Sequence, residues 1–143
     1  ILNRITQNRA KGKHTFIFID EIYLLFQHEY SANFLFTLWK RVRKYGAYAS
    51  GITQNVDDLL QSHTARTMLA NSEFIIMLNQ ASTDRTELAK LLNISDLQLS
   101  YITNVDAGHG LIKVGSSLVP FANKFPKNTK LYKLMTTKPG ENL

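Results

Sequence analysis

The sequence of 143 residues contains no cysteine. Disulfide bonds and metal sites built on thiolates are therefore excluded, and the absence is typical of a protein kept in a reducing compartment. No apolar run approaches the roughly 20 residues that cross a bilayer, and the opening stretch ILNRITQNRAKGKH is too polar for a signal peptide. Because the sequence begins with Ile1 rather than methionine, we expect a fragment or a processed product.

Two further motifs are missing. The four histidines are scattered without a helical H-x-x-x-H pair, which argues against a zinc site. A phosphate-binding loop needs the pattern G-x-x-x-x-G-K-[ST], whose backbone N–H groups surround phosphates. The segment RAKGKHT contains Gly12 and Lys13, but it lacks the first glycine and the following hydroxyl residue. It also precedes a predicted strand instead of following one, so we interpret it as a turn.

What the sequence does contain is a globular composition with an excess of positive charge. Apolar residues make up 44% and charged residues 20%, which favours a folded domain over disorder. Lysine and arginine number 17 against 11 acidic residues, a net charge of +6. This balance favours anionic partners such as nucleic acid, nucleotides or an acidic membrane surface, although many basic domains are simply soluble.

Alternating apolar strands and amphipathic helices predict an α/β fold in one domain spanning residues 1–143. Strands are expected at residues 14–19, 47–55 and 73–80, and a hairpin at 108–122 that turns at 115–117. Helices are expected at 1–11, 31–46, 82–93 and 95–102, and one or two short helices within 57–72. Such an order predicts a parallel sheet with helices on both faces.

Several residues mark the ends of these helices. Ser31 is a candidate N-cap and Gly46 a candidate C-terminal stop for the helix that carries Trp39, which we expect in the core. Asp84 with Glu87, and Ser95 with Gln98, have the spacing of capping boxes.

The small residues of AYASG, in the second strand, allow another element to approach closely. The basic stretch KFPKNTKLYK fits an edge strand protected by lysines or, less often, a nucleic-acid contact.

Polar side chains follow each of the three expected strands. Asp20 and Glu21 follow the first strand. Thr53 and Gln54 follow the second, and Asn79 and Gln80 follow the third. Ligands of parallel α/β sheets bind outside the carboxyl ends of the strands. In nucleotide hydrolases an acid at this place supports Mg²⁺, and its neighbour polarises the attacking water. The alternative for Asp20 is an N-cap, and for Glu21 a favourable first-turn acid.

In order and spacing the segments FIFIDEIYLLF, GITQNVDDLL, ARTMLANSEFIIMLNQ, LLNISDLQLSYI and GHGLIKVGSSLVPF resemble the C-terminal motor domain of conjugative-transfer ATPases. These are the large ATPases of type IV secretion systems, of the TraC and TrbE kind, in the HerA/FtsK superfamily. Within this group, the sequence most resembles the ATPases of Gram-positive conjugative elements. The resemblance runs from Phe16 to about Thr136. It implies a RecA-like core with a C-terminal β-hairpin, here without the Walker A portion.

The resemblance also implies roles for single residues. Asp20 matches the Walker B acid that supports Mg²⁺ through water, and Glu21 matches the catalytic base. Gln54 matches the glutamine that contacts nucleotide and water at the end of the neighbouring strand. Arg66, or as a second candidate Arg85, is expected to reach a phosphate from its own or a neighbouring subunit. The alternative for both arginines is a surface salt bridge, and for Arg85 it is the preferred one.

Two functions follow from these observations. The first is part of an ATP- and Mg²⁺-dependent motor that forms hexamers, works with other secretion components at the cytoplasmic face of the bacterial membrane, and energises transfer of DNA or protein. Without a phosphate-binding loop, the present chain alone is expected to be inactive. The second is a non-catalytic basic module that contacts DNA or a secretion partner. A nuclease with two metals is disfavoured because no further carboxylates converge.

Overall fold

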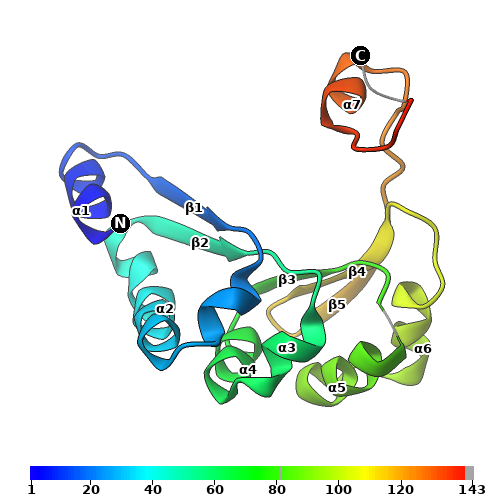
Figure 1. Ribbon diagram of the computed structural model, residues 1–143, viewed down its shortest axis with the longest axis horizontal. Coiled ribbons are helices and arrows are strands. Elements are labelled where there is room, and N and C mark those ends of the chain that lie inside the picture. The colour runs from blue at the N-terminus through cyan, green and yellow to red at the C-terminus, as the bar shows by residue number, and fades with distance from the viewer. Residues whose placement is uncertain (81, 141–143) are drawn as a thin grey trace.

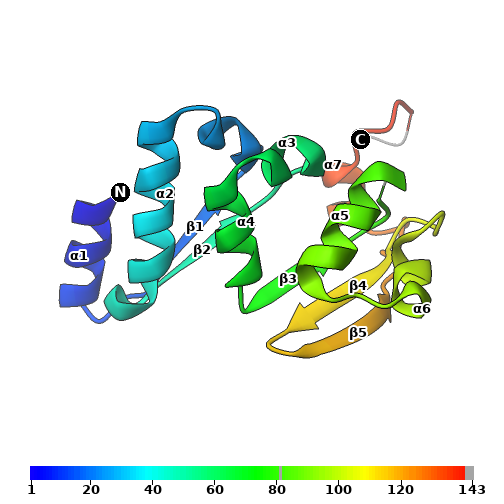
Figure 2. The same ribbon diagram turned by 90° about the horizontal axis from the view of Figure 1, so that it is seen from below.

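Helices of this protein pack against one side of two small β-sheets (Figures 1 and 2). The computed structural model describes the backbone of residues 1–80 and 82–140, and all of their side chains except those of 82–84. The strands are β1 (Thr15–Ile19), β2 (Ala47–Gly51), β3 (Phe74–Met77), β4 (His109–Val114) and β5 (Ser117–Ala122). The α-helices are α1 (Leu2–Ala10), α2 (Glu29–Arg41), α3 (Val56–Gln61), α4 (His63–Ala70), α5 (Ser82–Leu92), α6 (Asp96–Leu99) and α7 (Lys130–Met135). Short 3-10 helices are η1 (Ile22–Phe26), η2 (Val42–Tyr45) and η3 (Ser100–Ile102).

The strands divide into a parallel pair and an antiparallel group of three. β1 pairs with β2 in a register that sets Thr15 opposite Ala47 and Ile19 opposite Gly51. β3 pairs with β4, and β4 pairs with β5 across the predicted turn. The expectation of one parallel sheet through the first three strands is therefore wrong for β3, which pairs with the hairpin instead. The α/β class, the helices and the C-terminal hairpin are confirmed.

The core lies between the sheets and helices α1 to α6. One buried cluster joins β3 and β4 to α5, through Met77, Leu111 and Leu88 among others. A second joins η1 to α2 and α4 and contains Ile22 and Leu35, with Trp39 packed against it as expected. The third joins α1, α2 and β2. The opposite face of the strands carries exposed apolar side chains, so the expected covering on both faces is wrong within the described residues.

The ends of the helices follow the sequence in most cases. Gly46 stops η2 with φ of 66°, a left-handed conformation that glycine adopts without steric cost. Ser95 and Gln98 form the predicted capping box. The prediction for Ser31 is wrong: α2 begins at Glu29, and the Ser31 hydroxyl donates to backbone carbonyls of the preceding turn. The Asp84 side chain lies outside the described residues, so its capping box stays a prediction.

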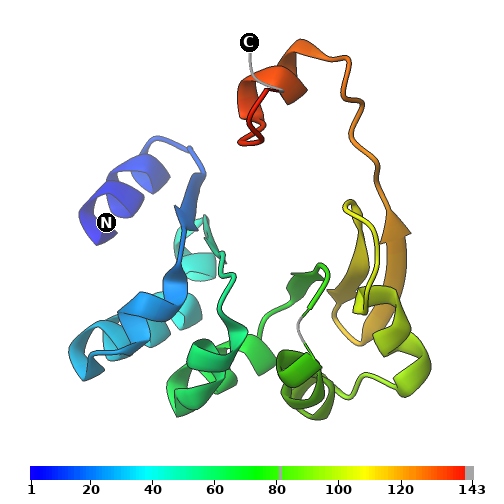
Figure 3. The same ribbon diagram turned by 45° about the vertical axis from the view of Figure 1, so that its right-hand side comes forward.

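The C-terminal segment differs from the expected edge strand. After β5 the chain runs in an extended path to α7, which stands clear of the sheets and the other helices (Figure 3). The side chains of Leu131, Leu134 and Met135 are exposed on it. No helix in residues 1–80 and 82–140 is both long enough and apolar enough to cross a membrane.

Candidate functional site

The corner after β1 is held tightly against the chain that follows β2. The Ile52 N–H donates to the Ile19 carbonyl at 2.8 Å, and the Ile22 N–H donates to the Ile52 carbonyl at 3.0 Å. Asp20 and Glu21 therefore bulge out between two residues that are both bonded to Ile52. This pair of hydrogen bonds was not visible in the sequence, because it depends on the spacing of two segments 30 residues apart.

Glu21 occupies the left-handed region, with φ of 47° and ψ of 47°. A residue with a side chain rarely adopts this conformation, and the strain amounts to about 1 kcal/mol or more. Strain of this kind gathers at functional sites, where the surrounding structure holds the residue in place. At Glu21 the two hydrogen bonds of Ile52 supply that constraint.

Asp20 projects from the same corner into solvent. One of its carboxylate oxygens, Oδ1, accepts a hydrogen bond from the Glu21 N–H at 3.0 Å. This bond orients the carboxylate beside the strand end. A single exposed carboxylate suits Mg²⁺ bound with phosphate, since Mg²⁺ in such sites keeps several waters and takes only one or two protein carboxylates. In the described part of the chain, no three His, Asp or Glu side chains gather in a group able to hold a metal by themselves.

The Glu21 carboxylate faces the neighbouring strand end. Its Oε1 accepts a hydrogen bond from Gln54 Nε2 at 3.5 Å, the long limit of such a bond. Its other oxygen, Oε2, is buried and has no hydrogen-bond partner among the described residues. A buried carboxylate oxygen without a donor is costly, and in native proteins it commonly marks a place for water or a ligand. The geometry thus fits a base that bonds to a water molecule.

The structure brings together Asp20, Glu21 and Gln54, as the sequence predicts. The third strand contributes nothing to this group. Asn79 Oδ1 accepts from the Val105 N–H, and the Gln80 side chain donates to the carbonyls of Leu78 and Asn79. Both amides serve local loops, because β3 pairs with the hairpin and not with β2. Of the three strand ends expected to line one site, those of β1 and β2 do so and that of β3 does not.

Arg66 lies on α4 and forms an ion pair with Glu87 of α5. The Arg66 guanidinium is 3.5 Å from Glu87 Oε2, and both side chains are about 40% exposed, at 42% and 39%. Lys90 contacts the other oxygen of the same carboxylate at 3.3 Å. An exposed pair of this kind contributes little stability, so it breaks at small cost. Arg85 is half-buried on α5 and has no ion pair within the described residues.

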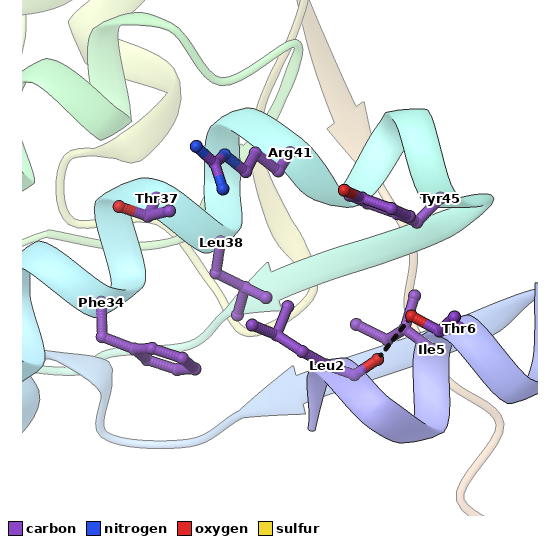
Figure 4. A pocket seen from close by; sticks show the side chains of 8 residues that line it. All are labelled: Leu2, Ile5, Thr6, Phe34, Thr37, Leu38, Arg41 and Tyr45. Atoms are coloured by element: carbon purple, nitrogen blue, oxygen red, sulfur yellow. Dashed lines mark hydrogen bonds between the residues drawn. The ribbon is translucent and has the colours of Figure 1, made fainter.

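A separate cavity of about 130 Å³ lies between α1 and α2 (Figure 4). Leu2, Ile5, Phe34 and Leu38 line it, with Arg41 and Tyr45 on the α2–η2 side. None of the residues predicted for the nucleotide site contributes to this cavity. Its apolar wall fits the packing of α1 against α2 and not the binding of a charged phosphate chain.

The sequence from residue 3 to residue 113 matches the family model described as the TraG P-loop domain. The chain belongs to this family. The TraG P-loop domain assignment confirms the resemblance to conjugative and type IV secretion ATPases.

Among solved structures, the chain is similar to VirB4 of Thermoanaerobacter pseudethanolicus, with a TM-score of 0.78 and 25% sequence identity. The match covers 87% of this chain and 34% of the VirB4 chain. The chain thus corresponds to about a third of that protein, and the likeness confirms the RecA-like fold. No curated protein matches the sequence.

Proposed function

We propose that the chain is the C-terminal part of an ATP-hydrolysing motor of a conjugation or type IV secretion system, and that it supplies the catalytic half of the nucleotide site. The observation that carries the proposal is Glu21, whose backbone is in the strained left-handed region. One of its carboxylate oxygens bonds to Gln54, and the other has no donor among the described residues. It stands beside an exposed acid at the carboxyl end of a parallel strand pair. That is where α/β proteins bind their ligands.

Each residue has a distinct task in this proposal. Asp20 supports Mg²⁺ through its water shell, and bound Mg²⁺ neutralises charge on the phosphates of ATP. Glu21 accepts the proton of the attacking water through the oxygen that lacks a donor. Gln54 also contacts the nucleotide, and it holds the Glu21 carboxylate and the water in line. The αL backbone at Glu21 fixes the direction of the carboxylate before ATP binds.

Arg66 is the first candidate for the residue that stabilises phosphate charge in the transition state, and Arg85 is the second. A guanidinium that reaches the phosphates from a neighbouring subunit contributes strongly in nucleotide hydrolases. The weak, exposed pair with Glu87 holds Arg66 while no phosphate is near. This role places the sites between subunits, which agrees with a hexamer as the working form.

The proposed setting is the cytoplasmic face of the bacterial membrane, with other secretion components as partners and DNA or protein as the cargo. The membership of the TraG P-loop domain family and the similarity to VirB4 support this setting. Residues 1–143 alone are expected to release no phosphate from ATP above background. The phosphate-binding loop, which the sequence lacks, supplies most of the grip on the triphosphate.

The test uses the full-length gene product that contains residues 1–143. We expect Mg²⁺-dependent release of phosphate from ATP that is lost in Asp20→Asn and kept in Asp57→Asn, a matched change at an exposed acid on α3. Equal activity of Asp20→Asn and the unchanged protein would remove Asp20 from the metal site. Absence of any ATP hydrolysis in the assembled protein would contradict the proposed function as a whole.

A second candidate function, binding of DNA by a basic module, is favoured by one observation. Residues 1–13 and 40–44 carry eight lysines and arginines and no acidic residue. The two segments adjoin, since the Arg9 guanidinium lies 5.6 Å from the centroid of the Tyr45 ring. Binding of labelled single-stranded DNA that weakens steeply with salt, and is lost in Lys11→Ala/Lys13→Ala but not in Lys90→Ala, would support this function. Binding unaffected by either change would oppose it.

A further inference from the structure

The amide of Gln54 meets Glu21 although the Gln54 side chain is exposed and has several rotatable bonds. The hydrogen bond between them, from Gln54 Nε2 to Glu21 Oε1, is 3.5 Å long, which is the limit of such a bond. A glutamine side chain loses much rotamer freedom when it is fixed, so a bond this weak does not hold it alone. The direction of the amide therefore depends on how the backbone at residue 54 is held.

Thr53 holds this backbone from one side. Its hydroxyl oxygen accepts a hydrogen bond from the Asn55 N–H at 3.1 Å, and the hydroxyl also donates to the Asn55 carbonyl at 3.2 Å. Both bonds span Gln54 and close a small ring that contains this residue. Threonine commonly forms such a turn with the backbone two residues further on. Thr53 is also β-branched, so its side chain has few rotamers and the ring is stiff.

Asn55 holds the other side, because it joins Gln54 to helix α3. Asn55 is the N-cap of α3: its Oδ1 accepts a hydrogen bond from the Asp58 N–H at 3.2 Å, and its Nδ2 donates to Asp58 Oδ2 at 2.7 Å. Since both ends of the Asn55 amide bond to the same residue, Asn55 is fixed relative to the first turn of α3.

Helix α3 and the end of β2 are themselves fixed by the core. Leu60 of α3 belongs to the buried cluster of β3, β4 and α5, and Leu59 belongs to the cluster of η1, α2 and α4. On the other side of the loop, Ile52 bonds to the residues before and after Asp20 and Glu21. The loop that carries Gln54 is thus held at both of its ends.

Helix capping explains Asn55 but does not explain Thr53. An asparagine N-cap that bonds to the third residue of its helix is common and needs no functional reason. The two bonds of Thr53 lie ahead of the first turn of α3, and the cap between Asn55 and Asp58 does not need them. What they add is a fixed conformation at residue 54, whose amide meets the Glu21 carboxylate.

We propose that Thr53 is a positioning residue for ATP hydrolysis and that it acts through Gln54. The Thr53 hydroxyl bonds to Asn55 and keeps Gln54 in the backbone conformation that directs its amide to Glu21. Glu21 accepts the proton of the attacking water in line only while this amide holds its carboxylate. A misplacement of about 1 Å can lower turnover about a hundredfold. The proposal rests on the proposed function and extends it to a residue outside the contact with nucleotide.

The first test is the steady-state kinetics of the full-length gene product. Thr53→Val keeps the shape of the side chain and removes the hydroxyl, so we expect kcat to fall about tenfold or more while the Kd for ATP changes less than about twofold. Thr53→Ser keeps the hydroxyl and should retain kcat within about threefold. Unchanged kcat in Thr53→Val, or an equal loss in Thr53→Ser, would overturn the proposal.

Thr67→Val on α4 is the matched control. The Thr67 hydroxyl also bonds to a backbone carbonyl, that of His63 at 3.0 Å, but it lies outside the candidate site. We expect Thr67→Val to retain kcat, and a loss equal to that in Thr53→Val would overturn the proposal. Activities are compared well below the unfolding temperature of each variant, so a loss of stability does not imitate the effect. Thr53→Ala, which places no methyl group where the hydroxyl was, should lose as much activity as Thr53→Val, and full activity would oppose the proposal.

A double-mutant cycle tests whether Thr53 acts through Gln54. In the Gln54→Ala background there is no amide to direct, so Thr53→Val should lower kcat by less than about a further twofold. Two effects that multiply in the double variant would show that Thr53 acts independently of Gln54, and this result would overturn the proposal.

Crystal structures of the full-length protein without nucleotide give a readout that needs no hydrolysis. We expect Gln54 Nε2 within hydrogen-bond distance of Glu21 in the unchanged protein and in Thr53→Ser, and away from Glu21 in Thr53→Val. The same position of the amide in all three structures would overturn the proposal. If the full-length protein hydrolysed no ATP, the proposed function would fail, and this comparison would still decide whether Thr53 positions Gln54.

Discussion

Gly51 lies directly against Ile22, the buried residue that follows the Asp20–Glu21 corner. A Cβ atom at position 51 would lie 2.6 Å from Ile22 Cδ1 and 3.3 Å from its Cγ2. Ile22 is 5% exposed and packs among α2, α3 and α4, so it has little room to move. The absence of a side chain at position 51 is therefore what allows the two strand ends of the candidate site to approach.

Gly51→Ala is expected to destabilise residues 1–143 by about 1–3 kcal/mol, because an extra methyl group in a packed core forces its neighbours from their rotamers. Chemical denaturation measures the change. The matched test adds Ile22→Val, which removes the Cδ1 atom that the new methyl would meet. In the Ile22→Val background Gly51→Ala should cost less, giving a coupling between the two positions. If the destabilisation by Gly51→Ala is the same with and without Ile22→Val, the contact between these two positions is unimportant.

Glu21→Gly is expected to raise stability while it abolishes turnover. Glycine removes the strain of the left-handed backbone and the buried carboxylate oxygen that lacks a donor. We expect a gain of up to about 1 kcal/mol in the free energy of unfolding. Asp20→Gly is the control, since Asp20 has no positive φ, and glycine there loosens the unfolded chain and removes the hydrogen bond from the Glu21 N–H. If Glu21→Gly lowered stability as much as Asp20→Gly does, the conclusion that the Glu21 backbone is strained would be contradicted.

Gln54→Ala in the full-length protein should lower turnover more than it lowers nucleotide affinity. The amide bonds to the Glu21 carboxylate at 3.5 Å and matters most when water is aligned for attack. Steady-state kinetics and equilibrium binding of ATP separate the two effects. Weak binding combined with normal turnover would leave Gln54 a binding residue only.

The proposed role of Arg66 across the subunit interface is tested by mixing subunits. Rings that combine Arg66→Ala subunits with Glu21→Gln subunits contain some interfaces in which both residues are intact. If Arg66 acts on the neighbouring subunit, the mixture is more active than either variant alone. With subunit exchange demonstrated, absence of recovery would assign Arg66 to its own subunit or to the ion pair with Glu87. Arg66→Ala itself should change stability by less than about 1 kcal/mol, because the pair is exposed.

The part of the site that the sequence predicts is the part built from adjacent parallel strands. Asp20 with Glu21, and Gln54, follow β1 and β2, whose carboxyl ends must share one edge of the sheet. The same reasoning failed for Asn79 and Gln80, because the apolar pattern of β3 does not show which strand will be its neighbour. An apolar strand pairs equally well with a parallel strand or with a hairpin, and only the tertiary fold decides between them.

Contacts between distant segments were also beyond the sequence. The pairing of Arg66 with Glu87 joins two helices separated by a strand, and no local spacing indicates it. The exposure of the strand face opposite the helices was not visible in the sequence either, since Phe16 and Phe18 fit a strand that is covered on both sides. The αL conformation of Glu21 was hidden for a similar reason: it arises from the two hydrogen bonds of Ile52 and not from a glycine or asparagine at that position.

In the proposed function Glu21 is the base of an ATP hydrolase. The most direct test measures ATP binding and ATP turnover of Glu21→Gln in the full-length protein, with Glu29→Gln on α2 as the matched control. The amide keeps the size of the side chain but cannot accept the proton of the attacking water, so we expect binding to be retained and turnover to fall by about a hundredfold or more. Turnover equal to that of the unchanged protein and of Glu29→Gln would contradict the assignment.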